Sequence, residues 1–318
     1  MNWKKSASWP GWFAICLLFA FSWTNARAAE AVIDSPSPAD VSPSGEKKVE
    51  EDSRRVELRR TFESGIEALS RKDYPVAYEY LRSSAEQGYP PSQAALAGMY
   101  LHGQGVEGNN SEAFKWYRLA AEQGNPDGQS GLGQMYALGL GTDVDYPLAL
   151  NWLRLAADQG DAVAQRKLGD MYLEGRGVES NEKEAAGWFR MAALQGDLSA
   201  QTNIGAAFRD GRGVEVDDVE AAWWFRQAAE HGSPEAQASL GLMYREGQGV
   251  HQDDIEAVQW FRQSAEQENA MAEYYLGVSY VEGKGLAQDF NEARLWLEKA
   301  AQQGLSEAKE YLSSGVIP

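Results

Sequence analysis

Residues 132–141 read LGQMYALGLG, and Trp152 follows eleven residues after them. A related stretch followed by a tryptophan recurs along the chain at a constant interval of 36 residues. These tryptophans are Trp116, Trp152, Trp188, Trp224, Trp260 and Trp296. A fixed period of this length is typical of helical solenoids, in which stacked repeats contact only their neighbours. The sequence therefore predicts an all-α solenoid of about seven helix-turn-helix repeats.

Each repeat carries the local signals of two helices joined by a glycine loop. In the repeat quoted above, Leu132 and Tyr136 lie four residues apart and so share one face of a helix. Gly133 lets a neighbouring helix approach closely, although glycine in a helix interior costs about 1 kcal/mol relative to alanine. Gly139 is placed to end the first helix, and Asp145 is placed to cap the second. We therefore expect this loop to be a structural turn.

The period also sets the domain boundaries. Residues 54–90 are in register with the repeats but have a shorter loop, as expected for an atypical N-terminal capping repeat. A C-terminal capping helix and tail are predicted at 305–318. Six full repeats fill 91–304, with predicted bounds of 91–124, 125–160, 161–196, 197–232, 233–268 and 269–304. Glu268 stands where the other repeats close with glycine, so we expect a different turn at that point.

The N-terminal residues have the features of an export signal. Lys4 and Lys5 precede an apolar run at 11–23, and a small-x-small cleavage site ends at Ala28. The apolar run is short for a spanning helix, so residues 1–28 are predicted to be a signal peptide, with an uncleaved anchor as the alternative. Residues 29–53 are predicted to be a disordered Ser/Pro-rich spacer. We expect a periplasmic or secreted protein with no stable membrane insertion after cleavage.

Charge and residue usage exclude several classes of function. The formal net charge is −18, and such an acidic surface repels nucleic acid and anionic lipid. The only cysteine, Cys16, lies in the predicted signal peptide, so the mature chain has no thiol nucleophile and no disulfide. The three histidines lie far apart in the sequence and do not have the spacing of a zinc site. We expect no catalytic residue, cofactor or metal, and the sequence does not indicate an oligomeric state.

Arginine recurs at the same place in the second helix of five repeats. Four of these arginines have an acidic residue four positions later, as in Arg118 with Glu122. The other three pairs are Arg154 with Asp158, Arg226 with Glu230 and Arg262 with Glu266. Side chains four apart on an exposed helix face are neighbours and stabilise it by a few tenths of a kcal/mol. The pattern therefore predicts four surface ion pairs within single helices.

The repeated residues resemble the Sel1-like repeat family, a branch of the tetratricopeptide-type α/α solenoids. The motif is small-x-x-x-Leu-Gly-x-Met-Tyr-x-x-Gly-x-Gly-Val, then Asx-x-x-x-Ala-x-x-Trp and Ala-Ala-x-x-Gly, and it covers about 62–312. The resemblance implies a right-handed superhelix that acts as a protein-interaction scaffold. For exported bacterial members it implies an adaptor that binds an envelope regulator, a cell-wall enzyme or an export component.

Two other functions stay open beside a non-enzymatic adaptor of the bacterial cell envelope. The first is a secreted or surface-exposed factor that binds a host protein. The second and weaker alternative is a hydrolase of cell wall or β-lactams, because a cysteine-rich branch of the family is linked to β-lactams. The mature chain has none of those cysteines, which argues against this activity.

The resemblance also implies a place for partner binding, since the first helices of such repeats line a concave groove. Carrying the family's groove positions over gives Leu101, Gln134, Arg166, Asp170, Leu173, Arg209, Leu242, Arg245, Met271, Tyr274, Val278 and Val281. The hypothesis is that the groove holds an extended or helical segment, with carboxylates against the arginines and an apolar anchor near Tyr274. Alternatively, the arginines are solvated or paired with local acids, and Met271, Tyr274 and Val278 pack under the C-terminal cap.

Overall fold

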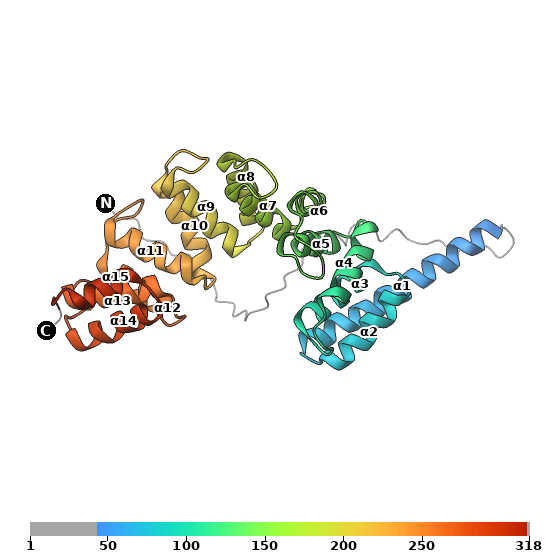
Figure 1. Cartoon of the computed structure of the whole chain (residues 1–318), viewed down its shortest axis with the longest axis horizontal. Helices are drawn as coiled ribbons and strands as arrows, with labels where there is room; N and C mark the ends of the chain where they lie inside the picture. The colour runs from blue at the N-terminus through green and yellow to red at the C-terminus, as the bar shows by residue number, and fades with distance from the viewer. Residues whose placement is uncertain (1–42, 317–318) are drawn as a thin grey trace, which may run out of the picture. The chain divides into compact units, whose positions relative to one another are not determined.

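The computed structural model describes residues 43–316, which form fifteen helices and no strand (Figure 1). The helices are α1 (Pro43–Ser70), α2 (Tyr74–Glu86), α3 (Pro90–His102), α4 (Asn110–Glu122), α5 (Pro126–Leu138), α6 (Tyr146–Asp158), α7 (Ala162–Glu174), α8 (Glu182–Leu194), α9 (Leu198–Asp210), α10 (Asp218–Glu230), α11 (Pro234–Glu246), α12 (Asp254–Ala265), α13 (Ala270–Glu282), α14 (Phe290–Gln302) and α15 (Ser306–Ser313). The predicted all-α repeat solenoid is confirmed. The predicted signal peptide and residues 29–42 lie outside the described residues.

The first helix begins earlier than the sequence pattern predicted. Helix α1 starts at Pro43, so it includes the last part of the range 29–53 that was expected to be a disordered spacer. Residues 46–55 are mostly Glu, Lys and Arg, which have high helix propensity even without an apolar face. The compact unit of the chain begins at Ser53. Within that unit, Arg59 and Glu63 add an ion pair of 2.9 Å between successive turns of α1.

The predicted helix ends are confirmed in every full repeat. Gly139 ends α5 in the left-handed conformation, with φ of 67°. Asp145 then caps α6 by accepting a hydrogen bond of 2.9 Å from the backbone N–H of Leu148. The equivalent capping side chains are Asn109, Asn181, Asp217, Asp253 and Asp289. Local chemistry therefore fixes the length of both helices and the position of the turn between them.

The helical glycines allow the close crossing that the sequence predicted. A Cβ atom added at Gly133 would lie 2.7 Å from Cγ of Leu153, and one at Gly169 would lie 2.5 Å from Cε1 of Phe189. Both distances are too short for non-bonded carbon atoms. In these two repeats the first and second helices are therefore packed too closely for a side chain at the glycine position to fit without a shift.

The hydrophobic core is a series of small clusters that follow the stack of repeats. In one cluster, Leu153 and Ala156 of α6 are buried against Ala164 and Leu168 of α7, so adjacent repeats share it. Most of the buried side chains on the second helices are alanines, which lets neighbouring helices pack closely. The first helix α5 also contacts α3 before it and α7 after it. These contacts place the first helices on the inner side of the stack.

Glu268, which replaces the glycine that closes the other repeats, changes the end of the preceding helix more than it changes the turn. Glu268 has φ of 62° and so adopts the left-handed conformation of the equivalent Gly232, whose φ is 93°. Helix α12 ends at Ala265, one residue before the position equivalent to the end of α10. The left-handed conformation costs about 1–2 kcal/mol for a residue with a Cβ atom. The left-handed turn is therefore retained at Glu268 at that cost, and the expectation of a different turn is wrong in this respect.

Candidate protein-interaction surface

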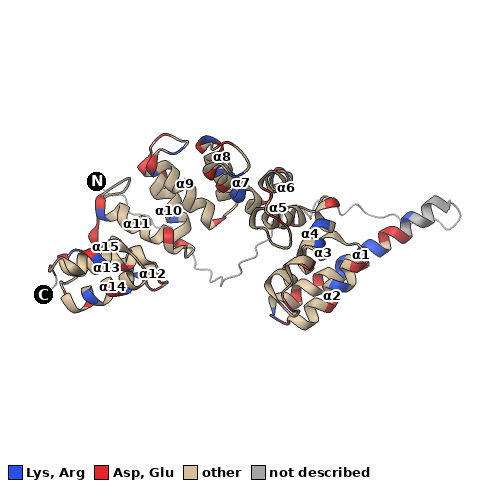
Figure 2. Cartoon of the chain, viewed as in Figure 1, with Lys and Arg blue, Asp and Glu red and all other residues tan. Residues whose placement is uncertain are grey.

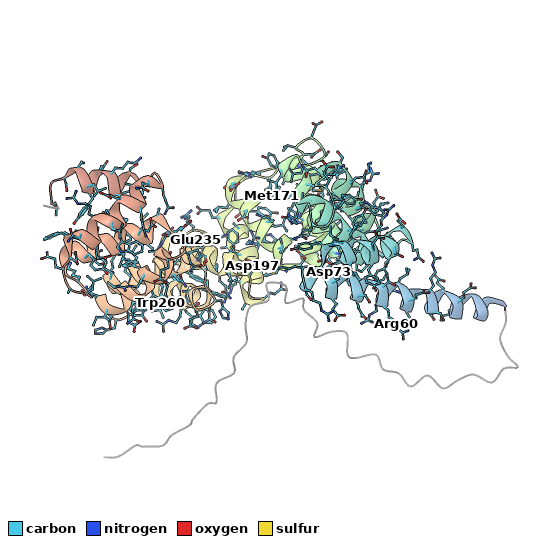
Figure 3. The ribbon with its side chains drawn as sticks, turned by 90° about the horizontal axis from the view of Figure 1, so that it is seen from below. Arg60, Asp73, Met171, Asp197, Glu235 and Trp260 are labelled. Atoms are coloured by element: carbon cyan, nitrogen blue, oxygen red, sulfur yellow. The ribbon has the colours of Figure 1, made fainter. Side chains whose placement is uncertain are left out.

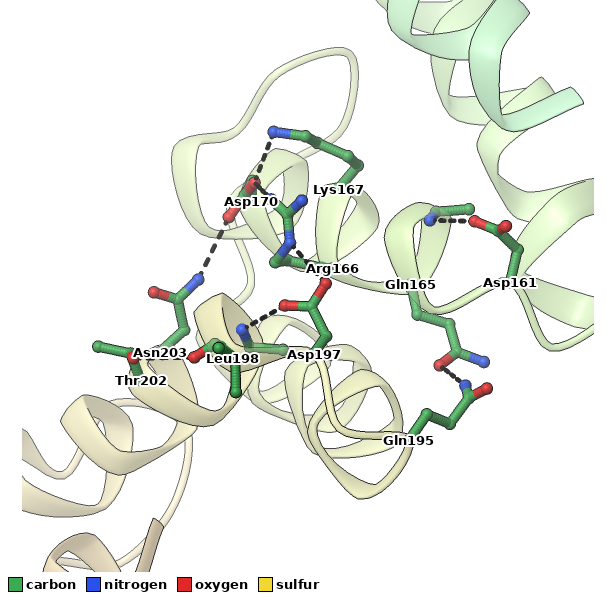
Figure 4. Close-up of polar contacts among 12 residues, drawn as sticks. Asp161, Gln165, Arg166, Lys167, Asp170, Gln195, Asp197, Leu198, Thr202 and Asn203 are labelled. Atoms are coloured by element: carbon green, nitrogen blue, oxygen red, sulfur yellow. Dashed lines mark hydrogen bonds and ion pairs between the residues drawn. The ribbon is translucent and has the colours of Figure 1, made fainter. Parts of the chain in front are cut away.

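Arg166 is fixed by acids of its own chain on two adjacent first helices (Figure 4). Its Nε lies 3.1 Å from Oδ2 of Asp197, which caps α9, and its Nη1 lies 3.7 Å from Oδ2 of Asp170 on α7. Lys167 lies 3.5 Å from the same Asp170 carboxylate. The Arg166 side chain is only 19% exposed. The pair therefore joins two repeats on the inner side of the stack.

The other two arginines predicted to line the groove also lie beside acids of the chain. Arg209 Nε is 2.8 Å from Oδ1 of Asp210. Arg245 Nη2 is 3.0 Å from Oε2 of Glu282, one repeat further on, and its guanidinium carbon lies 5.6 Å from the centroid of the Tyr275 ring. These ion pairs agree with the alternative stated above, in which the arginines pair with acidic residues of the same chain. A partner carboxylate would have to share these guanidinium groups.

The predicted apolar anchor near the C-terminus is mostly covered. Val278 and Val281 are 5% and 7% exposed and belong to a core cluster that includes Ala308 of α15. Tyr274 packs edge-on against Tyr311 of α15, with ring centroids 6.1 Å apart. Only Met271 is substantially open, with 41% exposed. Val278 and Val281 therefore lie in the core and not on an open groove, because α15 packs over this end of the stack.

The remaining predicted groove residues are half-buried on first helices. Leu173 packs against the core cluster of Tyr172, and Leu242 packs against the cluster of Phe261. Gln134 and Leu101 are also half-buried. They lie on four different first helices, so a ligand that contacted all four would run along several repeats.

The predicted pairing of the repeated arginines is wrong at three of four positions. Arg118 does lie 3.6 Å from Glu122. Arg226, in contrast, donates a hydrogen bond of 2.5 Å to the hydroxyl of Tyr244, eighteen residues later in the next first helix. Arg262 with Tyr280 and Arg154 with Tyr172 make the same contact. The tyrosine hydroxyl is held in place by packing, whereas the acid on the same helix is free to stay hydrated.

A recurring pair of glutamines, which the sequence reasoning missed, connects adjacent repeats. Gln165 in α7 donates through Nε2 to the carbonyl of Ala157 in the preceding repeat, at 3.2 Å. Its Oε1 accepts a hydrogen bond of 2.8 Å from Nε2 of Gln195 (Figure 4). We call this arrangement the glutamine clip. The same donor–acceptor pair joins Gln123 to Gln93, Gln159 to Gln129 and Gln267 to Gln237, and Gln303 to Glu273. The 36-residue spacing of these glutamines was a signal that could have revealed the clip.

Two aspartates near the starts of α5 and α7 have perturbed protonation. Burial raises the pKa of Asp127 to about 6, and the nearby charge of Asp161 contributes to the shift. Burial also raises the pKa of Asp161. Tyr117 lies close by, and burial raises its pKa to about 12. Part of this acidic surface therefore changes charge just below neutral pH.

Neither a metal site nor a membrane span is found in the part of the chain that the structure describes. No group of three or more His, Cys, Asp or Glu side chains in that part could hold a metal ion. None of the helices in residues 43–316 has both the length and the apolar character needed to cross a bilayer. The carboxylates are spread over many helices of the repeats (Figure 2).

Comparison with solved structures finds related repeat proteins. One is a protective antigen of uropathogenic Escherichia coli strains with an SLR fold, at 36% identity and a TM-score of 0.70. The match covers 84% of this chain and 58% of the antigen, so this chain spans under two thirds of that protein. Another is a Sel1 repeat protein from Oxalobacter formigenes, at 33% identity and a TM-score of 0.70, covering 76% of this chain and 99% of that one. The comparison with curated proteins gave no match.

The family model gives the assignment directly. The Sel1 repeat model matches at 62–89, 90–125, 126–161, 162–197, 198–233, 234–269 and 270–305. Sel1 repeat proteins generally mediate protein–protein interaction, and the solenoid is typically a non-catalytic scaffold. With seven matched repeats that fill most of its length, the chain belongs to the Sel1 repeat family.

Proposed function

We propose that this protein is a non-enzymatic adaptor of the bacterial cell envelope, whose inner surface of first helices holds a segment of a partner protein. The envelope location rests on the signal-like residues 1–28. The partner is an envelope regulator, a cell-wall enzyme or an export component. Binding along several first helices accounts for a chain that repeats its packing residues and varies its surface.

One observation carries this proposal. The position two residues after the buried leucine or isoleucine of each first helix holds a different residue in every full repeat, although that leucine or isoleucine is always present. That position holds Gly98, Gln134, Asp170, Ala206, Leu242 and Val278. It is half-buried in all but the last, where α15 covers it. A surface that changes from polar to apolar along the stack favours a partner segment with the matching order of residues.

The test is crosslinked capture from the native envelope with the full chain as bait. The variant Gln134→Arg places a bulky charge on the inner surface, and Gln302→Arg places the same side chain on the exposed face of α14 as a matched control. We expect the first variant to lose the captured partner and the second to keep it. Equal capture by both variants would contradict the groove. Unchanged capture by the double variant Arg166→Glu/Arg209→Glu would remove the arginines from the proposal.

A second candidate function is a surface-exposed factor that binds a host protein. The observation in its favour is the 36% identity to a protein described as a protective antigen of uropathogenic Escherichia coli. Protease treatment of intact cells separates the two functions. A surface factor would be digested, whereas a periplasmic adaptor would be protected until the outer membrane is opened.

A further inference from the structure

Two neighbouring cavities recur at the same place in successive repeats. The first, of about 620 Å³, lies where α10, α11 and α12 meet, and the second, of about 520 Å³, lies where α12, α13 and α14 meet. Their linings are related by the 36-residue period. The equivalent residues are Arg226 and Arg262, Tyr244 and Tyr280, and Trp260 and Trp296. The cavities therefore come from the repeat itself, and they lie away from the inner surface proposed above.

The unpaired charge of the first cavity is negative. Its cation, Arg226, donates to the Tyr244 hydroxyl and lies 5.7 Å from the centroid of the Tyr244 ring. Glu230 and Glu256 line the same cavity, and neither carboxylate has an ion-pair partner within residues 43–316. Glu266 and Glu292 occupy the equivalent positions in the second cavity, also unpaired among the described residues. Each cavity thus presents two glutamates that form no ion pair among the described residues, although an arginine that is bound to a tyrosine hydroxyl lines the same cavity.

The N-terminal repeats differ at the same positions. There the arginine equivalent to Arg226 pairs with the acid on its own helix, as Arg82 does with Glu86 at 2.7 Å and Arg118 does with Glu122 at 3.6 Å. The acid is neutralised in those repeats and left unpaired in the two cavities. At this position the two C-terminal cavities therefore differ in charge from the repeats of Arg82 and Arg118, whereas the repeat of Arg154 resembles the C-terminal ones.

Trp296, which lines the second cavity, already has a cation of its own chain against its ring. Lys299 places Nζ 4.0 Å from the centroid of the Trp296 ring, a cation–π contact. The residue equivalent to Lys299 beside Trp260 is Gln263, which has no charge. Trp260 lies on α12 (Figure 3), and it is one of the residues that line the first cavity. Trp260 therefore presents the same kind of aromatic ring as Trp296, but no lysine of its own chain stands at the position that Lys299 occupies beside Trp296.

We propose that the first cavity binds a lysine or arginine side chain of a basic partner segment. Glu230 and Glu256 supply the carboxylates, and Trp260 supplies an aromatic face for the cation. The second cavity binds another cation of the same segment through Glu266 and Glu292. The net charge of −18 favours the approach of such a segment at long range. This inference rests on the proposed function as a protein-binding scaffold and names the chemistry of one contact.

The test is fluorescence anisotropy with fluorescein-labelled octalysine and the full chain at 0.15 M NaCl. We expect Glu230→Gln/Glu256→Gln to weaken binding about tenfold, which corresponds to 1.4 kcal/mol. The control Glu57→Gln/Glu79→Gln removes two exposed carboxylates of α1 and α2 and should change affinity less than about twofold. Gln at position 256 is compatible with the start of α12, where Glu and Gln both fit a capping box.

The outcomes separate the two proposals. Equal weakening by both double variants would show general attraction to an acidic protein and would overturn the cavity site. No weakening by Glu230→Gln/Glu256→Gln would overturn it as well, provided that circular dichroism shows an unchanged melting temperature. If envelope capture persists while octalysine binding is non-specific, the adaptor stands and only the cationic contact fails.

Discussion

His231 interrupts the glutamine clip, and replacing it with glutamine should stabilise the protein. In the neighbouring repeat, Gln195 Nε2 donates to Gln165 Oε1 at 2.8 Å. In the repeat that follows, the acceptor is Gln201, but the donor position holds His231, which turns its Nδ1 toward the carbonyl of Gln227 at 2.8 Å. Gln201 Oε1 is therefore a buried acceptor with no hydrogen-bond partner among the described residues. The variant His231→Gln supplies the missing donor.

The size of the effect follows from the one hydrogen bond that the variant adds. A net intramolecular hydrogen bond contributes about 0.5–1.5 kcal/mol, and leaving a buried acceptor unsatisfied costs about 1–3 kcal/mol. The hydrogen bond that His231 makes to the carbonyl four residues earlier is kept, because Gln159 makes the same bond to Leu155 at 3.2 Å. We therefore expect the free energy of unfolding to rise by about 1 kcal/mol, or about 2–4 °C in melting temperature.

Urea unfolding followed by circular dichroism measures this change, and hydrogen exchange of the α9 and α10 amides locates it. His251→Gln is the matched control, because His251 is exposed and its ring nitrogen hydrogen-bonds to the backbone carbonyl of Gln252. A second control is Gln201→Met, in which the benefit of His231→Gln should disappear. Two results would refute the missing clip: no gain from His231→Gln, or a gain that survives in the Gln201→Met background.

Three further changes have predicted directions. Glu273 occupies a clip position where other repeats have glutamine, and burial raises its pKa, so the folded chain loses stability as pH rises through that pKa. Glu273→Gln should remove this pH dependence and add about 1 kcal/mol at pH 7, as measured by urea unfolding at several pH values. Glu268→Gly should relieve the left-handed conformation and raise the unfolding free energy by about 1 kcal/mol, whereas Glu266→Gly should not. Asp127, with a pKa of about 6, favours the protonated form when folded, so wild-type stability should fall as pH rises from about 4 to about 6. Asp127→Asn should flatten that part of the melting-temperature profile, and an unchanged slope would contradict the assignment.

The sequence predicted the features that depend on local chemistry. The capping by Asp145, the left-handed Gly139 and the tight crossing at Gly133 each follow from one residue type at a periodic position. The partner of Arg226 could not be predicted in that way, because Tyr244 comes into reach only when the next repeat packs. The burial of Val278 likewise depends on α15 lying over the end of the stack. Partner-binding residues are the hardest to predict, since they are the ones that the period does not constrain.

The glutamine clip escaped prediction for a different reason. Its spacing is visible in the sequence, but glutamine is usually an exposed residue, so a glutamine that recurs near a helix start is typical of a solvated surface. The structure buries Gln165 and gives both ends of its amide a partner. A polar residue that recurs at the repeat period is therefore a sign of a buried contact between repeats.

The shared junctions between repeats have a consequence for how such a chain changes length. Because the contacts of α5 with α6 and of α6 with α7 are rebuilt from equivalent residues one period later, the loss or duplication of 36 residues would rejoin matching surfaces. Unequal recombination between the copies would then produce shorter and longer proteins that still fold. Each such event would change the length of the solenoid by one repeat. Family members with different numbers of repeats would then bind partner segments of different lengths.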